Sequence, residues 1–377
     1  MPFNKKSLIF VLFLSLNLIS ITSYSKPSEK KSQPRRAYSE GRMNTEKVAY
    51  KIEAQLLPEE SKLLGSTTIK WVNPTKIPAR SLRFHLFYNA FQNEKTTLLK
   101  ELEFYRKSKK ELDAYQFGEI KIKEMRIIEG EELTHKIKTI SPDDQNLHDR
   151  TVMEVKLKDP VKPLQAITIK ISYILMIPEI IDRTGRADDY FFMSLWYPKI
   201  GVLQQDGTWN CHQYHKDSGF FANFGTYQVA ITLPEKFIIG ATGNLEGKTK
   251  NADGTYTFVF KEKNIHSFTW VAYPHFKEII EKISLKGNRT ETKIVLLLPP
   301  HHRKEKQRYL DALKFSLQYY AENIFPYPYK KITLVVPPYQ AIKSANHSYP
   351  GLISLYSWTI IPRKFLLPER NTIQEFG

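Results

Sequence analysis

The chain has 377 residues, of which 41% are hydrophobic, 13% aromatic and 25% charged. This balance excludes a wholly disordered chain and supplies enough apolar side chains for the cores of two domains. The formal net charge is +17, but the basic residues are scattered in small groups and no nucleic-acid-binding motif accompanies them. We therefore expect no nucleic-acid partner, whereas an anionic envelope surface is compatible with the charge. The oligomeric state is not indicated.

Residues 1–25 have the form of a signal peptide. Two lysines precede an apolar stretch over residues 8–21, and Ser23-Tyr-Ser resembles a cleavage site of the form small-x-small. We therefore expect an exported protein, periplasmic or secreted, with an uncleaved membrane anchor as the alternative. Residues 26–45 are polar and contain proline and glycine, which predicts a flexible lead-in.

A β-rich domain is predicted over residues 46–288. Apolar and polar side chains alternate in several short segments rich in β-branched and aromatic residues, as is typical of half-buried antiparallel strands. These segments are residues 50–56, 66–72, 152–157, 166–173, 227–233 and 255–260. Residues 95–107 interrupt them with leucines on one face of a predicted helix.

A second domain is predicted over residues 289–377. A continuous apolar strand at 292–298 precedes a helix at 302–325 and a further strand at 332–336, as in an α/β unit. The chain as a whole is thus predicted to be α+β. We expect this second domain to be truncated and its helix to lack packing partners. We therefore expect the apolar side chains on one face of this helix to be partly exposed. They are Tyr309, Leu313, Leu317 and Tyr320.

Five segments, taken in order, resemble one enzyme family. They are Phe84-His-Leu-Phe-Tyr-Asn-Ala-Phe-Gln-Asn, Trp196-Tyr-Pro-Lys, Trp209-Asn-Cys-His-Gln-Tyr-His, Ile239-Gly-Ala-Thr-Gly-Asn and Ser267-Phe-Thr-Trp. Together they resemble the membrane alanyl aminopeptidase family of zinc metallopeptidases, the aminopeptidase N type. The resemblance implies a saddle-like N-terminal domain of mostly antiparallel β-sheet. It also implies that the truncated second domain is the beginning of a thermolysin-like catalytic domain.

The resemblance also implies where a site would lie. In the family a loop runs beside the substrate like a β-strand, and its Glu binds the free α-amine of a peptide. The matching residues here are Asn346, His347 and Ser348, so a neutral hydroxyl replaces the charged group. A second family motif, H-E-x-x-H on a helix, supplies two zinc ligands and the general base. Here Gln374 stands at the first ligand position and Glu375 at the base position.

These replacements predict an inactive relative of the zinc aminopeptidases, which remove N-terminal amino acids from peptides. We expect no metal and no cofactor in this chain, although zinc belongs to the resembled family, and we expect Glu375 not to function as a base. Two alternatives stay open. The chain is a non-catalytic module that binds peptides or envelope partners, or it is a fragment of an active metallo-aminopeptidase from a disrupted gene.

Other polar residues give weaker signals. His212 and His215 have a spacing that could suit two metal ligands. Residues three apart in an alternating strand point to opposite faces, however, so we expect no metal site there. The histidine pair at 301–302 follows two prolines and is expected at the surface. The charged segment 182–189 lacks the spacing of a calcium loop and predicts a turn. The only cysteine, Cys211, excludes an internal disulfide.

Overall fold

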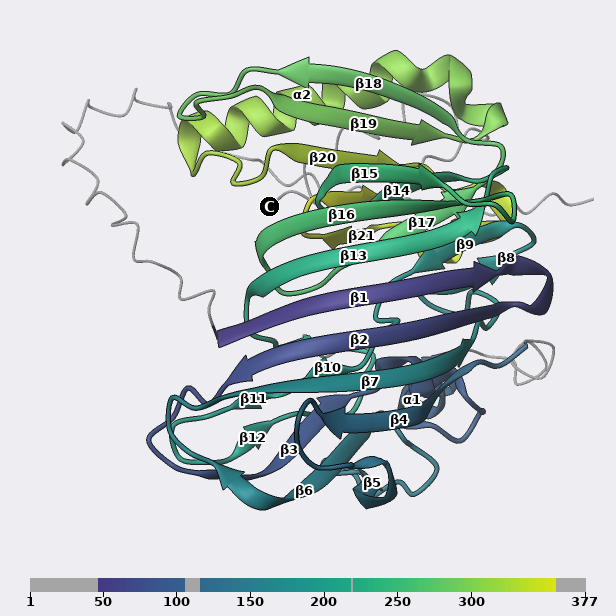
Figure 1. Ribbon diagram of the computed structural model, residues 1–377. Helices are drawn as coiled ribbons and strands as arrows, with labels where there is room; N and C mark the ends of the chain where they lie inside the picture. The colour runs from purple at the N-terminus through teal and green to yellow at the C-terminus, as the bar shows by residue number, and fades with distance from the viewer. Residues whose placement is uncertain (1–46, 106–115, 218–219, 357–377) are drawn as a thin grey trace, which may run out of the picture. The chain divides into compact units, whose positions relative to one another are not determined.

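The computed structural model describes residues 47–105, 116–217 and 220–356 (Figure 1). The predicted signal peptide and lead-in lie outside the described residues, and so do Gln374 and Glu375. Within the described residues, no helix is long and apolar enough to span a membrane. The predictions made for these outlying segments therefore stay predictions.

The largest element is a seven-stranded sheet in the order β15-β16-β13-β1-β2-β7-β4 (Figure 1). Its strands are β15 (Asn244–Lys250), β16 (Thr255–Ile265), β13 (Gly225–Pro234), β1 (Val48–Leu57), β2 (Lys62–Val72), β7 (Ala166–Met176) and β4 (Glu119–Ile127). All neighbours are antiparallel except β1 and β13, which run parallel. The alternating sequence pattern explains the two faces, because every second side chain points into the core. Each of the six alternating segments predicted from the sequence falls on a strand of the structure.

Three smaller sheets pack beside it. The first, in the order β10-β3-β6-β5, contains β10 (Lys199–Ile200), β3 (Ala79–His85), β6 (Val152–Val161) and β5 (Ile137–Ile140). The second, in the order β14-β17-β9-β8, contains β14 (Ile238–Ala241), β17 (Trp270–Tyr273), β9 (Tyr190–Met193) and β8 (Gly185–Ala187). The third pairs β11 (Val202–Leu203) with β12 (Trp209–Asn210). Large aromatic side chains fill the core among these sheets; Trp71, Trp196 and Trp270 are all 0% exposed.

The helix predicted over residues 95–107 is confirmed as α1 (Thr97–Tyr105). It buries Leu98 and Leu99 completely against a small apolar cluster that contains Phe91 and Tyr214. Short 3-10 helices occur elsewhere in the described residues, at Pro58–Glu60, Phe87–Phe91, Thr134–Lys136, Pro300–Glu305 and Tyr339–Ser344.

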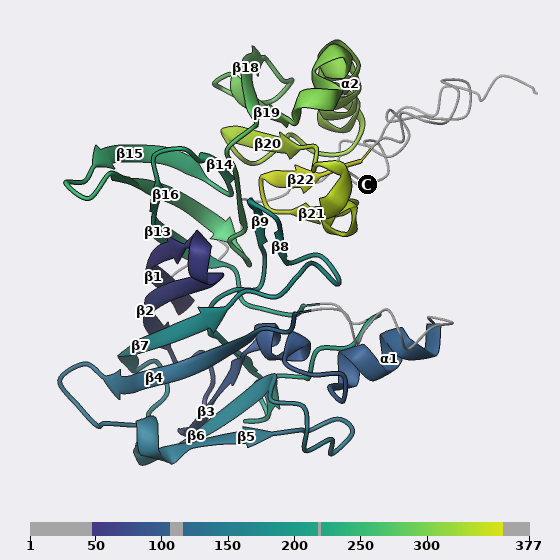
Figure 2. The same ribbon diagram turned by 90° about the vertical axis from the view of Figure 1, so that its right-hand side faces the viewer.

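A five-stranded sheet follows, in the order β18-β19-β20-β22-β21 (Figure 2). It contains β18 (Lys277–Ile283), β19 (Thr292–Leu298), β20 (Lys331–Val335), β22 (Leu352–Ser354) and β21 (His347–Tyr349). β19, β20 and β22 are parallel, and the two edge strands are antiparallel to their neighbours. The helix α2 (Lys306–Asn323) connects β19 to β20, which confirms the predicted order of strand, helix and strand.

The expected exposure of α2 is wrong for three of its four residues. Tyr309 and Leu313 are 0% exposed and Leu317 is 1% exposed, whereas Tyr320 is half-buried. The reason is that the parallel strands of the sheet supply the packing partners. Leu296, Leu334 and Ile353 belong to the same buried cluster.

The five-stranded sheet also packs on the sheet that contains β9 and β17. Phe192 and Val271 from that sheet share one buried cluster with Val295, Leu297 and Leu352. Polar contacts cross the same boundary, since Lys331 Nζ donates to the carbonyl oxygen of Ala241 at 2.6 Å. The described residues after 288 are therefore held by the β-rich part rather than standing apart from it.

Candidate functional site

The strand β21 carries the residues that match the family's substrate-binding loop. It is the edge strand of the five-stranded sheet and pairs through Ser348 with Ile353 of β22. Asn346, which precedes the strand, has a left-handed φ of 60°, a conformation that asparagine tolerates better than most residues. Its N–H donates to the carbonyl oxygen of Ser354 at 2.7 Å. Ser348 is exposed, so its hydroxyl is accessible to a ligand.

A charged loop of the β-rich part lies against β21. Nε2 of His347 is 4.0 Å from Oδ1 of Asp182. The other carboxylate oxygen of Asp182 accepts hydrogen bonds from Nε of Arg183 at 3.1 Å and from the hydroxyl of Tyr214 at 3.0 Å. The backbone N–H of Arg183 donates to the carbonyl oxygen of Lys343 at 3.2 Å. The structure thus joins β21 to two charged residues that sequence reasoning did not assign to the site.

The electrostatics of β21 follow from burial. Desolvation, and then the positive charge of Arg183, lower the pKa of His347 to about 4. The imidazole is therefore neutral at neutral pH. Asn346 and Ser348 carry no charge either, so a substrate ammonium meets no charged side chain on β21 itself.

The loop that carries Arg183 has an unusual backbone. Arg183 has a φ of 42° and Gly185 a φ of 126°, and a Cβ on Gly185 would lie 2.6 Å from the carbonyl oxygen of Pro178. Only glycine fits there. The hydroxyl of Thr184 lies 2.9 Å from the carbonyl oxygen of Ser194 and anchors the loop between these two positions. Such sparsely populated conformations concentrate at functional sites, where the surrounding structure enforces them.

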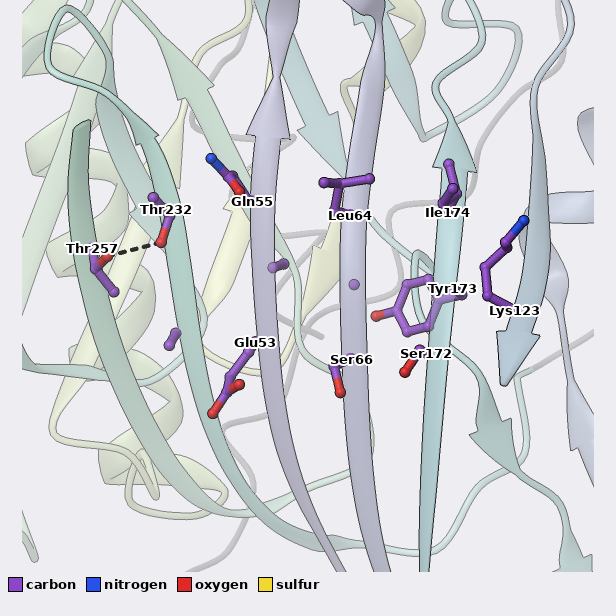
Figure 3. A pocket seen from close by; sticks show the side chains of 13 residues that line it. Glu53, Gln55, Leu64, Ser66, Lys123, Ser172, Tyr173, Ile174, Thr232 and Thr257 are labelled. Atoms are coloured by element: carbon purple, nitrogen blue, oxygen red, sulfur yellow. Dashed lines mark hydrogen bonds between the residues drawn. The ribbon is translucent and has the colours of Figure 1, made fainter. Parts of the chain in front are cut away.

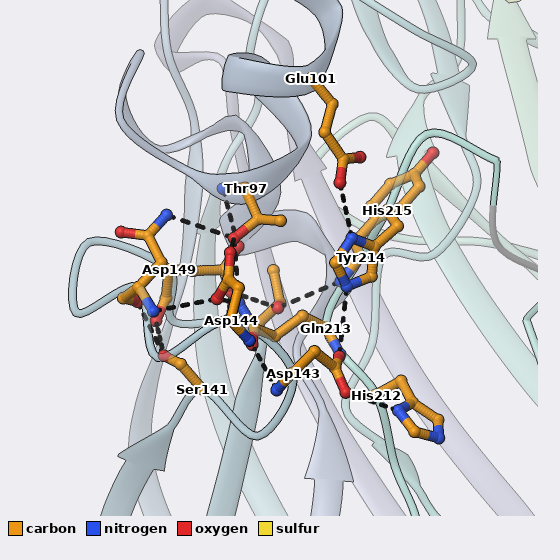
Figure 4. Close-up of polar contacts among 12 residues, drawn as sticks. Thr97, Glu101, Ser141, Asp143, Asp144, Asp149, His212, Gln213, Tyr214 and His215 are labelled. Carbon is orange, nitrogen blue, oxygen red and sulfur yellow. Dashed lines mark hydrogen bonds and ion pairs between the residues drawn. The ribbon is translucent and has the colours of Figure 1, made fainter.

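A second polar cluster joins α1 to the segment after β12 (Figure 4). Nδ1 of His215 lies 2.7 Å from Oε1 of Glu101, and Nε2 of His215 lies 3.2 Å from Oδ2 of Asp143. Nδ1 of His212 lies 2.7 Å from the other oxygen of Asp143. The argument that the two histidines point to opposite faces is therefore wrong, because the strand β12 ends at Asn210 and the following irregular segment turns both rings toward Asp143.

The charges in this cluster support one another. Partial burial disfavours the charged imidazole, but the hydrogen bonds to Glu101 and Asp143 outweigh it and raise the pKa of His215. Burial likewise acts against the Asp143 carboxylate, yet its hydrogen bonds with His212, Gln213 and His215 lower its pKa. In the described part of the chain, no group of three or more His, Cys, Asp or Glu is arranged to hold a metal ion. These contacts link α1, the segment after β5 and the segment after β12.

Two further residues considered in the sequence analysis, Cys211 and His302, are buried. Cys211 is 2% exposed, and burial raises the pKa of its thiol to about 12, so the thiol stays protonated. The prediction that both histidines at 301–302 lie at the surface is wrong for His302, which is 0% exposed. Its Nδ1 lies 2.9 Å from Oε2 of Glu305, at the end of the same 3-10 helix. Its partner His301 is exposed.

Comparison with known proteins finds similarity to solved structures. No family model and no curated protein matches the chain. Among solved structures, a mutant form of the M1 zinc metallopeptidase from Deinococcus radiodurans is similar, with a TM-score of 0.51 and 14% sequence identity. The match covers 87% of this chain and 62% of that chain, so this chain spans less than two thirds of the similar structure. The chain therefore has a fold like that of the M1 zinc metallopeptidases.

Proposed function

We propose that this chain is an exported relative of the zinc aminopeptidases that binds peptides but does not remove their N-terminal residue. The observation that carries the proposal is β21, an edge strand that presents an exposed Ser348 where the resembled family has its amine-binding Glu. The five-stranded sheet and α2 are, in this proposal, the first part of a thermolysin-like catalytic domain.

Peptide binding follows from the geometry of an edge strand. Such a strand presents backbone N–H and C=O groups on its outer side, and an extended peptide can pair with them as an additional strand. Backbone hydrogen bonds supply the affinity in this mode and are independent of the peptide's sequence. The neutral side chains of Asn346, His347 and Ser348 add no preference for a free α-amine.

The absence of turnover follows from the chemistry of two replacements. A charge-assisted hydrogen bond is about twice as strong as a neutral one, so Ser348 holds an ammonium less firmly than a Glu would. Zinc in proteins is bound by thiolate, imidazole and carboxylate groups. The amide of Gln374 is not one of these ligand types. Without bound zinc, Glu375 has no metal-bound water to activate in this proposal.

The catalytic half of the proposal is tested with aminoacyl-anilide substrates. We expect the purified protein to release no product above the blank, with or without added Zn²⁺. A zinc-dependent turnover that the substitution Glu375→Gln abolishes would contradict the proposal.

The binding half is tested with a fluorescent extended peptide in two forms, one with a free amine and one N-acetylated. We expect wild-type protein to bind both forms equally, and Ser348→Glu to favour the free amine by about tenfold, or ~1.4 kcal/mol. Thr139→Glu, on an exposed position of β5, is the control and should bind both forms alike. A wild-type preference for the free amine would show that another carboxylate replaces the missing one.

A further inference from the structure

The solvent face of the seven-stranded sheet carries a row of cations that the peptide-binding proposal does not use. Strand register places Arg126 opposite Lys170, Lys170 opposite Thr68, and Thr68 opposite Lys51. The row continues through Gln228 to Lys261. It reads Arg126, Lys170, Thr68, Lys51, Gln228 and Lys261. Four of these six residues are basic and none is acidic.

Two of the cations have acidic partners within their own strands. Nζ of Lys51 is 3.1 Å from Oε1 of Glu53, and Nε of Arg126 is 3.6 Å from Oε1 of Glu124. Lys170, half-buried between them, forms no ion pair with any described residue. It also faces Arg126 directly, and like charges directly opposite each other destabilise a sheet. An anion bound beside Lys170 would relieve this repulsion.

A hollow of about 370 Å³ lies on this row. Lys51, Arg126 and Lys170 line it together with the hydroxyl groups of Ser66 and Thr68. The side chain of Ile128 and the carboxylate of Glu53, which pairs with Lys51, complete the lining. Ammonium, guanidinium and hydroxyl groups are all hydrogen-bond donors, and charge-assisted bonds to carboxylate or phosphate oxygens are the strongest they form. Three cations against the single carboxylate of Glu53 leave this lining with a net positive charge, which favours an anion.

A larger hollow of about 630 Å³ adjoins the first and shares Glu53 and Ser66 with it (Figure 3). Apart from Lys123, its further lining is uncharged, with hydroxyl and amide groups beside two large aliphatic side chains. These residues are Gln55, Ser172, Thr232, Thr257, Leu64 and Ile174. Both volumes fall within the roughly 300–1,000 Å³ of ordinary ligand pockets. Register places Thr257, Thr232 and Gln55 side by side and Leu64 next to Ile174. A polar and an aliphatic stretch next to each other match a sugar ring, which has polar edges and apolar C–H faces.

We propose that the two joined hollows bind an anionic glycan. Its acidic group lies beside Lys170, Lys51 and Arg126, and its sugar rings lie in the hydroxyl-lined hollow. A nucleic acid fits less well, since base stacking needs an open aromatic face. The one aromatic residue of the lining, Tyr173, is only 2% exposed.

The test measures binding of tetragalacturonate, which carries one carboxylate per sugar, to the full chain by titration calorimetry. The neutral galactose tetramer is the uncharged comparison. We expect only the acidic tetramer to bind and Lys170→Gln to weaken its binding about tenfold. Lys156→Gln, an exposed lysine on β6 in another sheet, should leave binding unchanged. Added salt should weaken the interaction, since partly exposed charges are screened.

A second variant separates the sugar from the charge. Ser172→Val keeps a strand-compatible side chain and should weaken tetragalacturonate binding while leaving the binding of inorganic polyphosphate unchanged. Lys170→Gln should not lower the unfolding temperature, because it removes a like-charge contact, so lost binding with an unchanged melting curve supports the site. The proposal is overturned if the neutral tetramer binds equally, if Lys156→Gln weakens binding as much as Lys170→Gln, or if Ser172→Val has no effect. It is also overturned if folded wild-type protein binds no tetragalacturonate.

Discussion

A methyl group added at Gly240 tests whether the five-stranded sheet packs on the β-rich part. A Cβ at this position of β14 would lie 2.5 Å from Cδ1 of Leu297 in β19 and 3.0 Å from Cγ2 of Thr333 in β20. Overpacking of this kind costs ~1–3 kcal/mol. A glycine-to-alanine change without a clash would instead stabilise the protein by ~0.4–1 kcal/mol through the unfolded chain. We therefore expect Gly240→Ala to destabilise the protein, whereas a glycine-to-alanine change without a clash would stabilise it.

The matched control is Gly247→Ala in β15. A Cβ there would meet only Cβ of Val259 at 3.9 Å, which is ordinary contact. We expect Gly240→Ala to lower the free energy of unfolding by ~1–3 kcal/mol and Gly247→Ala to leave it unchanged or slightly higher. Urea unfolding followed by tryptophan fluorescence measures both, because Trp196 and Trp270 are fully buried.

A double-mutant cycle locates the effect. Leu297→Ala alone should cost ~2–5 kcal/mol, because Leu297 is 0% exposed. In the Gly240→Ala background the new methyl group enters the space that Leu297 vacates. The double variant should therefore be more stable than the sum of the single effects by at least ~1 kcal/mol. Additive effects, or a Gly240→Ala that behaves like its control, would show that the two sheets do not meet at this point.

Three further outcomes are expected. The stabilisation that His215 provides, measured as the difference in unfolding temperature between wild type and His215→Gln, should be full below about pH 6.5. This stabilisation should vanish as the pH rises through the raised pKa of His215 in the folded protein. A difference in unfolding temperature that stays constant up to pH 9 would contradict this. So would an equal difference for the control variant His148→Gln, at an exposed histidine. Limited proteolysis should leave α2 and β19 as resistant as the β-rich part, because Leu313 and Leu317 are buried, and early cuts inside α2 would oppose this packing. Equilibrium dialysis should find no stoichiometric Zn²⁺, and one equivalent lost on His212→Ala would reveal a metal site at the histidine pair.

The sequence alone determined the local structure well. Period-two alternation predicts the long strands, and the three- and four-residue spacing of apolar side chains predicts α1 and α2, because these periodicities reflect which face of an element is buried. The family resemblance, carried by short motifs in order, agrees with the fold like that of the M1 zinc metallopeptidases. The identities of Ser348 and Gln374 lead to the prediction that amine and zinc binding are lost, because that chemistry depends on residue type, and this stays a prediction.

Only the tertiary structure decided what depends on distant contacts. The burial of Tyr309 and Leu313 depends on neighbouring parallel strands, which the sequence of the helix does not reveal. The approach of Asp182 and Arg183 to β21 joins segments far apart in the chain, and no spacing signals it. The convergence of His212 and His215 on Asp143 depends on where β12 ends, and the cationic row depends on strand register. Pairing partners and register are set by the packing of the whole fold, because local sequence fixes only which side chains of a strand share a face.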